Sequence, residues 1–325
     1  MPERKVLEPI IVSASRETDL PRYYFDWFLS RLEAGMCQWK NSFNGQVYNV
    51  SFAKTRAIVF WSKNPAPVLE THSGGETTRL QKLEALGFRN YYFQFTLNDY
   101  DRERLEPNVP DVLTRIGTFK RLVDVIGFGR VVWRFDPLVL AKGVDLDELQ
   151  ERVGKIGDAL KGYTEKLVFS YVDIEGYRKV STNLAGLGCR EFSPTERLQF
   201  AQSLVKLNER WNYVLATCGE ECDLPGIEHN RCIDDQLMKR LFSSDYDLMT
   251  YFGGEQQLDG SWYFPDAKKD KGQRKSCGCV ASKDIGMYNT CPHLCRYCYA
   301  NANDSQVLSN WSRHKSNPCG PMIVM

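Results

Sequence analysis

Apolar, β-branched stretches alternate with amphipathic helical patterns along most of this chain. The expected strands cover residues 9–15, 57–63, 90–97, 129–135, 166–172 and 212–218. The helical patterns between them cover residues 26–35, 77–87, 112–127, 145–162 and 193–211. Nearly continuous apolar strands that alternate with helices predict a parallel sheet covered by helices. Six or more such units without a long break favour an α/β fold of the TIM type, a full or partial parallel barrel.

No internal repeat or low-complexity linker divides the sequence, so we expect one domain over residues 1–325. Its βα units occupy residues 1–245, and residues 246–325 form a part richer in loops. One more short strand is expected over residues 284–289, directly before a group of cysteines. Ser193 and Glu196 have the spacing of a capping box, which predicts where the helix of residues 193–211 begins.

The composition excludes some classes of protein. No apolar run approaches the roughly 18 residues of a membrane span, so no membrane partner is expected. The N-terminal residues lack the apolar core of a signal peptide, which predicts a cytoplasmic location. The net charge of +1 gives no overall basic field for nucleic acid, although the basic strip 265–275 keeps a local site open. Eleven cysteines in a reducing compartment indicate metal or redox chemistry.

Three of these cysteines stand close together near the C-terminus. Cys291, Cys295 and Cys298 have the spacing C-x₃-C-x₂-C in the stretch CPHLCRYCYAN. Three thiolates in one loop can hold three irons of a 4Fe–4S cluster and leave the fourth iron open to another ligand. A zinc site or a disulfide framework is the alternative. The uneven spacing argues against paired zinc-knuckle halves, and disulfides need an oxidising compartment.

The cysteine spacing resembles that of the radical S-adenosylmethionine (SAM) enzymes. This resemblance implies a 4Fe–4S cluster whose open iron binds SAM, and reductive cleavage of SAM to a 5′-deoxyadenosyl radical. It also implies that Tyr297, directly before the last cysteine, lies beside SAM; packing in the core under the loop is the alternative for this side chain. A reductant such as ferredoxin or flavodoxin would then be a partner.

The order of the segments resembles an uncharacterised family, a domain of unknown function whose C-terminal cysteines look like the radical-SAM motif. The stretches that carry this resemblance are SASRETDLP, FWSKNP, QFTLNDYDRERLEPNVP, WRFDPL and RKSCGCVASKDIGMYNTCPHLCRYCYAN. Radical-SAM enzymes normally place the cysteines after the first barrel strand. The resemblance therefore implies a circularly permuted barrel in which residues 284–289 lie beside residues 9–15. Residues 105–139 are more weakly similar to spore photoproduct lyase and its repair-photolyase relatives.

Polar side chains follow the expected strands at their carboxyl ends. Ser15, Arg16, Lys63, Asn98 and Arg134 are the candidates for binding the carboxylate, amine and ribose of SAM. The alternative is structural pairing, such as Arg134 with Asp136. Two Gly-Gly-Glu tripeptides, at residues 253–255 and 74–76, resemble a SAM-binding motif, but neither stands in the expected order along the chain.

A second group of cysteines precedes the first. Cys218, Cys232, Cys277 and Cys279 are the preferred set for an auxiliary iron–sulfur cluster or a zinc ion, with Cys222 and His229 as possible substitutes. The alternative is that several of them are ordinary buried thiols. Cys37, Cys189 and Cys319 are expected to be inert.

The sequence thus predicts a radical SAM enzyme with an unidentified substrate, either a small molecule, a peptide or DNA. Two alternatives remain open at this point. One is a DNA-lesion repair lyase similar to spore photoproduct lyase. The other is a protein without enzymatic activity that binds zinc or an electron-transfer iron–sulfur cluster.

Overall fold

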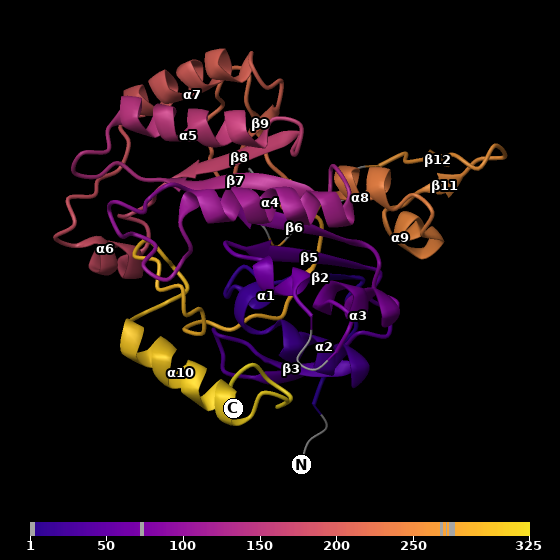
Figure 1. Ribbon diagram of the computed structural model, residues 1–325. Coiled ribbons are helices and arrows are strands. Elements are labelled where there is room, and N and C mark those ends of the chain that lie inside the picture. The colour runs from indigo at the N-terminus through magenta and orange to yellow at the C-terminus, as the bar shows by residue number, and fades with distance from the viewer. Residues whose placement is uncertain (1–3, 72–74, 267–268, 271, 273–276) are drawn as a thin grey trace.

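A single parallel sheet organises the computed structural model of the chain (Figure 1), which describes residues 4–71, 75–266, 269–270, 272 and 277–325. Eight parallel strands lie in the order β10-β9-β8-β7-β6-β5-β2-β13. In chain order they are β2 (Ile11–Ala14), β5 (Ala57–Ser62), β6 (Tyr91–Thr96), β7 (Val131–Leu138), β8 (Lys166–Tyr171), β9 (Val214–Thr217), β10 (Glu228–His229) and β13 (Lys283–Asp284). The α/β class and the parallel sheet are therefore confirmed, and β10 and β13 form the two edges of the sheet.

Helices cover one face of this sheet. Figure 1 shows α4, α5 and α7 lying along the strands, with α3 beside them. The helices that precede or follow the central strands are α1 (Leu20–Tyr23), α2 (Phe25–Glu33), α3 (Arg79–Ala85), α4 (Val112–Ile126), α5 (Leu146–Leu160), α6 (Arg178–Leu184) and α7 (Pro194–Asn208). The capping box at Ser193 and Glu196 is present and opens α7, as predicted. Apolar side chains of these helices and of the strands form one continuous core, which includes Phe28, Leu122 and Trp133.

The other face of the sheet has an apolar floor and a polar rim. The floor is closed by α8 (Asp235–Leu241) and α9 (Tyr246–Tyr251). The side chains that meet there come from four strands and these two helices: Val59, Tyr92, Val132, Val168, Leu237, Met238, Leu248 and Met249. Two residues further along the strands the same face becomes polar, with Trp61, Gln94, Arg134 and Ser170. Since the period of a strand is two, these polar residues lie directly above the apolar floor, towards the carboxyl ends.

The last strand of the sheet lies beside the first. Lys283 and Asp284 of β13 pair in parallel with Val12 and Ser13 of β2, which confirms that the C-terminal strand neighbours the N-terminal one. The expected strand over residues 284–289 is wrong in its bounds, because β13 ends at Asp284. The Asp284 carboxylate accepts hydrogen bonds from the backbone N–H groups of Arg16 and Gly286, and this local bonding replaces the ladder of a longer strand.

Several elements were not predicted from the sequence. Two smaller sheets are present: β1 (Val6–Leu7), β4 (Val47–Ser51) and β3 (Met36–Lys40) form one, and β11 (Glu255–Gln256) pairs with β12 (Trp262–Tyr263) in the other. A 3₁₀ helix covers Ala66–Leu69, and α10 (Asp304–Ser316) follows the cysteine loop. No helix within the described parts of the chain is long and apolar enough to cross a membrane.

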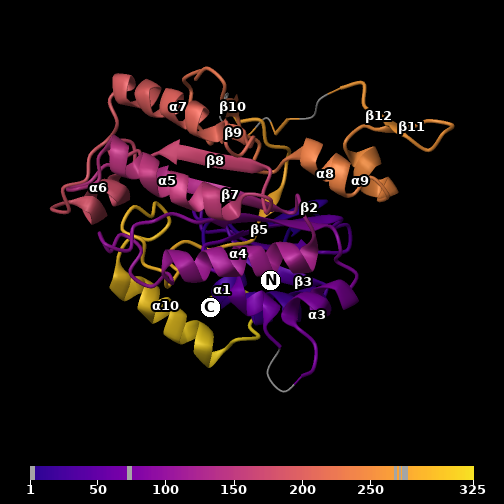
Figure 2. The same cartoon turned by 45° about the horizontal axis from the view of Figure 1, so that its top comes forward.

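The C-terminal segment packs against the N-terminal elements. Figures 1 and 2 show the yellow helix α10 next to the indigo helix α1, where the Trp311 ring contacts Tyr23. The Trp27 indole donates to the carbonyl oxygen of Gly320 at 2.8 Å, and the Gln38 N–H donates to that of Pro321 at 2.7 Å. The two halves of the site described below, which lie far apart in the sequence, are held together by these contacts and by the β13–β2 pair.

Candidate metal and cofactor site

The loop between β13 and α10 contains Cys291, Cys295 and Cys298. Its turns are fixed by backbone bonding: the N–H of Cys298 donates to the carbonyl of Cys295 at 3.1 Å, and Leu294 has a positive φ of 56°. The Asn301 amide donates to the carbonyl oxygen of Cys291 at 2.9 Å, which ties the end of the loop to its start. The three cysteines therefore stand in one compact loop at the carboxyl edge of the sheet.

Cys295 is buried, Cys291 and Cys298 are half-buried, and the three thiols are near enough to affect one another's pKa. Burial, with further contributions from Asp19 and Cys298, raises the pKa of Cys291 to about 12. Burial also raises the pKa of Cys295, and Cys291 and Cys298 are among the neighbours that add to this shift. Burial raises the pKa of Cys298 as well, although the backbone N–H groups of Ala300 and Asn301 oppose it. Three adjacent thiols cannot all ionise in a buried loop unless a cation compensates their charge.

This loop fits an iron–sulfur cluster in its ligand chemistry. Thiolates are the soft ligands that such clusters need, and hydrogen bonds to the sulfurs tune them. Backbone N–H groups point at two of the sulfurs, those of His293 and Asp19 at Cys291 and those of Ala300 and Asn301 at Cys298. Among the described residues, no group of three or more Cys, His, Asp or Glu side chains is arranged closely enough around one point to hold a metal ion. The fit therefore rests on the donor set and its hydrogen bonds.

A buried polar network lies under the cysteine loop. The Tyr297 hydroxyl accepts from the Lys63 ammonium at 2.8 Å and from the Asn98 amide at 2.9 Å, and it donates to Glu106. Lys63 also pairs with Glu106 at 2.8 Å. Three of the residues predicted to bind SAM, Lys63, Asn98 and Tyr297, thus meet in one place, and here their polar atoms bond to one another and to Glu106.

Glu106 is a member of this network that sequence reasoning missed. Its carboxylate lies between Lys63 and Arg115, which approaches it at 3.3 Å. Burial alone would raise its pKa, but the two cations overcome this effect and lower the pKa to about 2. In the sequence Glu106 stands among the charged residues of DRERLEPNVP, where nothing marks one carboxylate as buried.

A second polar group forms where β2 ends. The Ser13 and Ser15 hydroxyls donate to the two oxygens of Asp284 at 2.7 and 2.6 Å. The Trp61 indole donates to the Ser13 hydroxyl at 3.1 Å and lies between two guanidinium groups, those of Arg16 at 5.2 Å and Arg134 at 5.1 Å. The predicted residues Ser15, Arg16 and Arg134 therefore also meet, around Asp284 and Trp61.

Arg134 shows the structural pairing that the sequence left open. Its guanidinium pairs with Asp136 and contacts the sulfur of Cys232 at 3.2 Å. Burial would lower the pKa of Arg134, but Cys232 and Asp136 raise it. In the same way burial opposes the charge of Arg16, whereas Asp284, Cys232 and Cys279 raise its pKa. Both cations are thus held between carboxylates and sulfur atoms.

The preferred second set of cysteines also comes together. The sulfurs of Cys218 and Cys232 are 3.2 Å apart, the Cys279 sulfur accepts from the Cys232 N–H at 3.1 Å, and Cys277 and Cys279 shift each other's pKa. Their substitutes lie elsewhere: Cys222 is exposed, and His229 bonds to Asp223 at 2.7 Å. The cysteines expected to be inert are scattered, with Cys37 buried in β3, Cys189 half-buried and Cys319 exposed.

A histidine within the cysteine loop was also missed. His293 follows Cys291 by two residues, and its Nε2 lies 2.8 Å from the Asp19 carboxylate. The Ser62 hydroxyl and the Lys63 N–H donate to the same carboxylate, at 2.7 Å each. These bonds lower the pKa of Asp19 although burial would raise it. Asp19 therefore connects the loop to the end of β5, and no local pattern predicts such a contact across 274 residues.

The Gly-Gly-Glu tripeptide of residues 253–255 does not join either polar group. Glu255 stands in β11, in a hairpin that Figures 1 and 2 show projecting beyond α8 and α9, away from α10. Gly254 packs against Trp262 and Phe264 of the same hairpin. The other tripeptide begins at Gly74, which lies outside the described residues, as does most of the strip 265–275.

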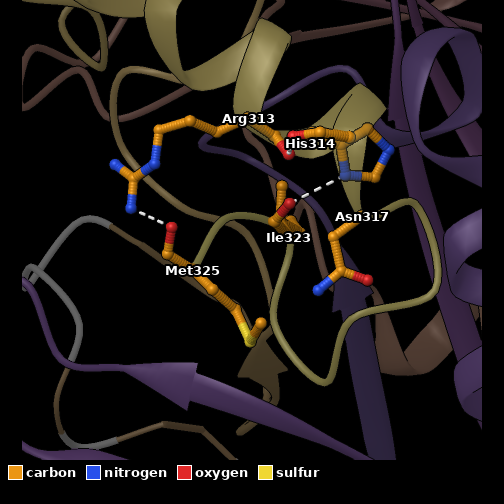
Figure 3. A pocket seen from close by; sticks show the side chains of 6 residues that line it. Arg313, His314, Asn317, Ile323 and Met325 are labelled. Carbon is orange, nitrogen blue, oxygen red and sulfur yellow. Dashed lines mark hydrogen bonds between the residues drawn. The ribbon is translucent and has the colours of Figure 1, made fainter.

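A small hollow of about 210 Å³ lies elsewhere, at the end of α10. Figure 3 shows its lining: His314 Nδ1 lies 2.8 Å from the carbonyl oxygen of Ile323, and Arg313 donates to the main-chain oxygen of Met325. Another, of about 510 Å³, lies between α8 and the β11–β12 hairpin. Neither hollow is lined by a predicted site residue, so neither marks the site.

A comparison with known protein families gives a match over most of the chain. Residues 11–300 match the family described as Domain of unknown function (DUF1848). The match begins at β2 and runs through the sheet to the end of the cysteine loop. The comparison with curated proteins gives no match. The predicted resemblance to an uncharacterised family is thus confirmed: the chain belongs to the DUF1848 family, a domain of unknown function.

Proposed function

We propose that this protein is a radical SAM enzyme on a circularly permuted, partial parallel barrel. The observation that carries the proposal is the position of three thiols, buried Cys295 and half-buried Cys291 and Cys298, in one loop directly after β13. Because β13 pairs with β2, this loop stands at the carboxyl edge of an eight-stranded parallel sheet. Active sites of parallel barrels are built at that edge.

The three cysteines would hold a 4Fe–4S cluster, with N–H donors at Cys291 and Cys298 supporting the thiolates. When bound, the cluster supplies the electron that cleaves SAM and so starts radical chemistry on a substrate. The two polar groups at the strand ends have different tasks in this proposal. Lys63, Asn98 and Tyr297 support the loop from below. Ser15, Arg16 and Arg134, around Trp61, provide cations and hydroxyls for the carboxylate and ribose of SAM.

The substrate class is not fixed by these residues. Arg16 is only partly buried, whereas Arg134 is 2% exposed, so Arg16 is the cation of this group that a substrate bound beside SAM would also contact. An anionic small molecule or peptide suits this cation better than duplex DNA, whose binding depends on a row of basic side chains. The reductant is expected to be a small electron carrier such as ferredoxin or flavodoxin, in the cytoplasm.

The first prediction tests SAM cleavage. Anaerobic reconstitution with iron and sulfide, followed by dithionite and SAM, should yield 5′-deoxyadenosine in the wild type, measured by chromatography. Cys295→Ala removes one of three ligands, so the yield should fall to the background level. Cys319→Ala, which changes an exposed cysteine outside both groups, should leave the yield unchanged.

The opposite result identifies the alternative function. If the wild-type protein binds zinc but no iron and leaves SAM intact, it is a metal-binding protein without this activity. Equal yields from the wild type and Cys295→Ala would also contradict the proposal, because the product would then arise without the loop.

A further inference from the structure

Four cysteines from three segments lie on the face of the sheet that α8 and α9 cover. Cys218 follows β9, Cys232 follows β10, and Cys277 and Cys279 belong to the segment that leads into β13. Cys232 and Cys279 are buried, at 5% and 2% exposure, within the apolar floor above α8 and α9. The sulfurs of Cys218 and Cys232 are 3.2 Å apart, the Cys279 sulfur accepts from the Cys232 N–H, and Cys277 is close enough to Cys279 for each to shift the pKa of the other. The four thiols therefore lie near one another, although these described side chains are not gathered around one point as they would be on a bound ion.

We propose that Cys218, Cys232, Cys277 and Cys279 bind a single zinc ion as a closed, structural tetrathiolate site. The inference is independent of the proposed SAM chemistry. Zinc–sulfur bonds of about 2.3 Å in a tetrahedron place neighbouring sulfurs about 3.8 Å apart. The Cys218–Cys232 separation of 3.2 Å is close to that value. Thiolates of a cubane cluster stand on different irons and lie further apart, so one ion fits the spacing better than a cluster.

Hydrogen-bond donors surround the sulfurs as they do around metal-bound thiolates. The Cys279 sulfur accepts from the backbone N–H groups of Cys232 at 3.1 Å and Ile233 at 3.3 Å. The Cys232 sulfur accepts from the Asn230 amide at 3.1 Å and from the Arg134 guanidinium at 3.2 Å. Donors of this kind are the outer-shell partners that orient ligands and stabilise their negative charge.

The positively charged side chains around the four cysteines also suit a zinc tetrathiolate site. Four thiolates around a divalent cation leave a net charge of about −2. Two guanidinium groups face the cluster: Arg134 contacts Cys232 directly, and Arg16 is close enough to interact with Cys232 and Cys279. On binding, each thiol loses its proton to solvent, and zinc takes the place of the four protons without any change of oxidation state.

The zinc site would link two segments of the chain to each other beside the sheet. Residues 230–233 and 277–280 run side by side, since the Val280 N–H donates to the carbonyl of Ile233 at 3.1 Å. Arg231 packs against Gly278, where a Cβ would lie 2.7 Å from its side chain. Residues 230–233 follow the edge strand β10, and residues 277–280 precede the edge strand β13. Zinc would therefore also fix Cys232, which contacts the Arg134 guanidinium.

The test measures zinc per chain in the wild type and in a variant that lacks the other cysteine loop, with Cys291, Cys295 and Cys298 all changed to Ala. Both proteins should contain about one zinc per chain and resist removal by a weak chelator. Adding Cys232→Ser or Cys277→Ser should reduce the zinc content at least tenfold. Cys222→Ser is the matched control, because Cys222 is exposed on the same loop as Cys218, and it should change nothing.

A second measurement, made on the wild type, tests the site even if the cysteine variants fail to fold. Cobalt(II) exchanged into the wild type should give the intense visible bands of a tetrahedral site, with thiolate charge-transfer absorption that corresponds to four sulfurs. The proposal is overturned if the variant without Cys291, Cys295 and Cys298 folds but contains no zinc. It is also overturned if it contains iron with acid-labile sulfide, or if mass spectrometry finds a Cys218–Cys232 disulfide. None of these results bears on 5′-deoxyadenosine formation, so the two proposals fail separately.

Discussion

At the scale of single residues, the candidate site depends on buried charges that neutralise one another. Glu106, with a side chain that is 1% exposed, lies between Lys63 and Arg115. A buried ion pair adds little stability compared with an apolar pair, but removing one partner leaves the other charge uncompensated. Glu106 neutralises Lys63 and, together with Asp101, Arg115, so its loss should leave two buried cations short of negative charge.

Glu106→Gln is therefore expected to lower the free energy of unfolding by about 3–5 kcal/mol, measured by urea denaturation at pH 7. The folded-state pKa of about 2 lies below the ordinary value of 4.5, so the contribution is complete above about pH 4.5. It is lost as the pH falls from there towards 2. Glu151→Gln, which changes an exposed pair with Lys155, should leave the urea midpoint unchanged. Equal effects of the two variants would contradict the assigned role.

At the scale of elements, the turn after β13 decides where the cysteine loop begins. Gly286 lies against Ser15 at the end of β2, and a Cβ on it would overlap the Ser15 hydroxyl and lie 2.8 Å from the Ser15 Cβ. Both atoms belong to a short, buried side chain whose hydroxyl is bonded to Asp284. A Cβ at this position would displace Ser15 from its hydrogen bond to Asp284, so the turn favours glycine.

Gly286→Ala should destabilise the fold by about 1–3 kcal/mol through overpacking, measured as a loss of thermal or urea stability. The same change at Gly117 is the control, because this exposed glycine of α4 has open space around its Cα. Gly117→Ala should stabilise the protein by up to about 1 kcal/mol, since alanine favours a helix interior. A neutral effect at Gly286 would show that β2 and the turn can separate without cost.

At the scale of the whole molecule, the two ends of the chain form one structural unit. Asp284 of β13 accepts hydrogen bonds from Ser13, Ser15 and the Arg16 N–H, all more than 260 positions earlier in the chain. A carboxylate that satisfies several buried donors leaves all of them unpaired when it is removed. The two ends should therefore open together.

Asp284→Ala is expected to speed up amide hydrogen exchange both in residues 11–16 and in the cysteine loop, as followed by mass spectrometry. Amides of β7 and β8, in the middle of the sheet, should exchange as slowly as in the wild type, because local opening precedes global unfolding. Faster exchange in the cysteine loop alone would mean that β2 holds its place without β13.

The pattern of the sequence was sufficient to predict the central architecture. Near-continuous apolar runs such as residues 57–63 and 90–97 became β5 and β6, because burial on both faces requires them to lie inside a covered sheet. The capping box at Ser193 began α7 where expected, since its bonds are local. Short edge strands such as β10 were missed, because two residues show no periodicity.

The sequence by itself determined the parallel α/β class, the compact cysteine loop and the list of candidate polar residues, because these follow from local periodicity and spacing. Only the tertiary structure decided how the candidates divide: Lys63, Asn98 and Tyr297 around Glu106, Arg16 and Arg134 around Trp61, and four further thiols beside them. Burial and the pairing of charges are long-range properties. They depend on which segments the sheet brings together, and local patterns in the sequence do not reveal those contacts.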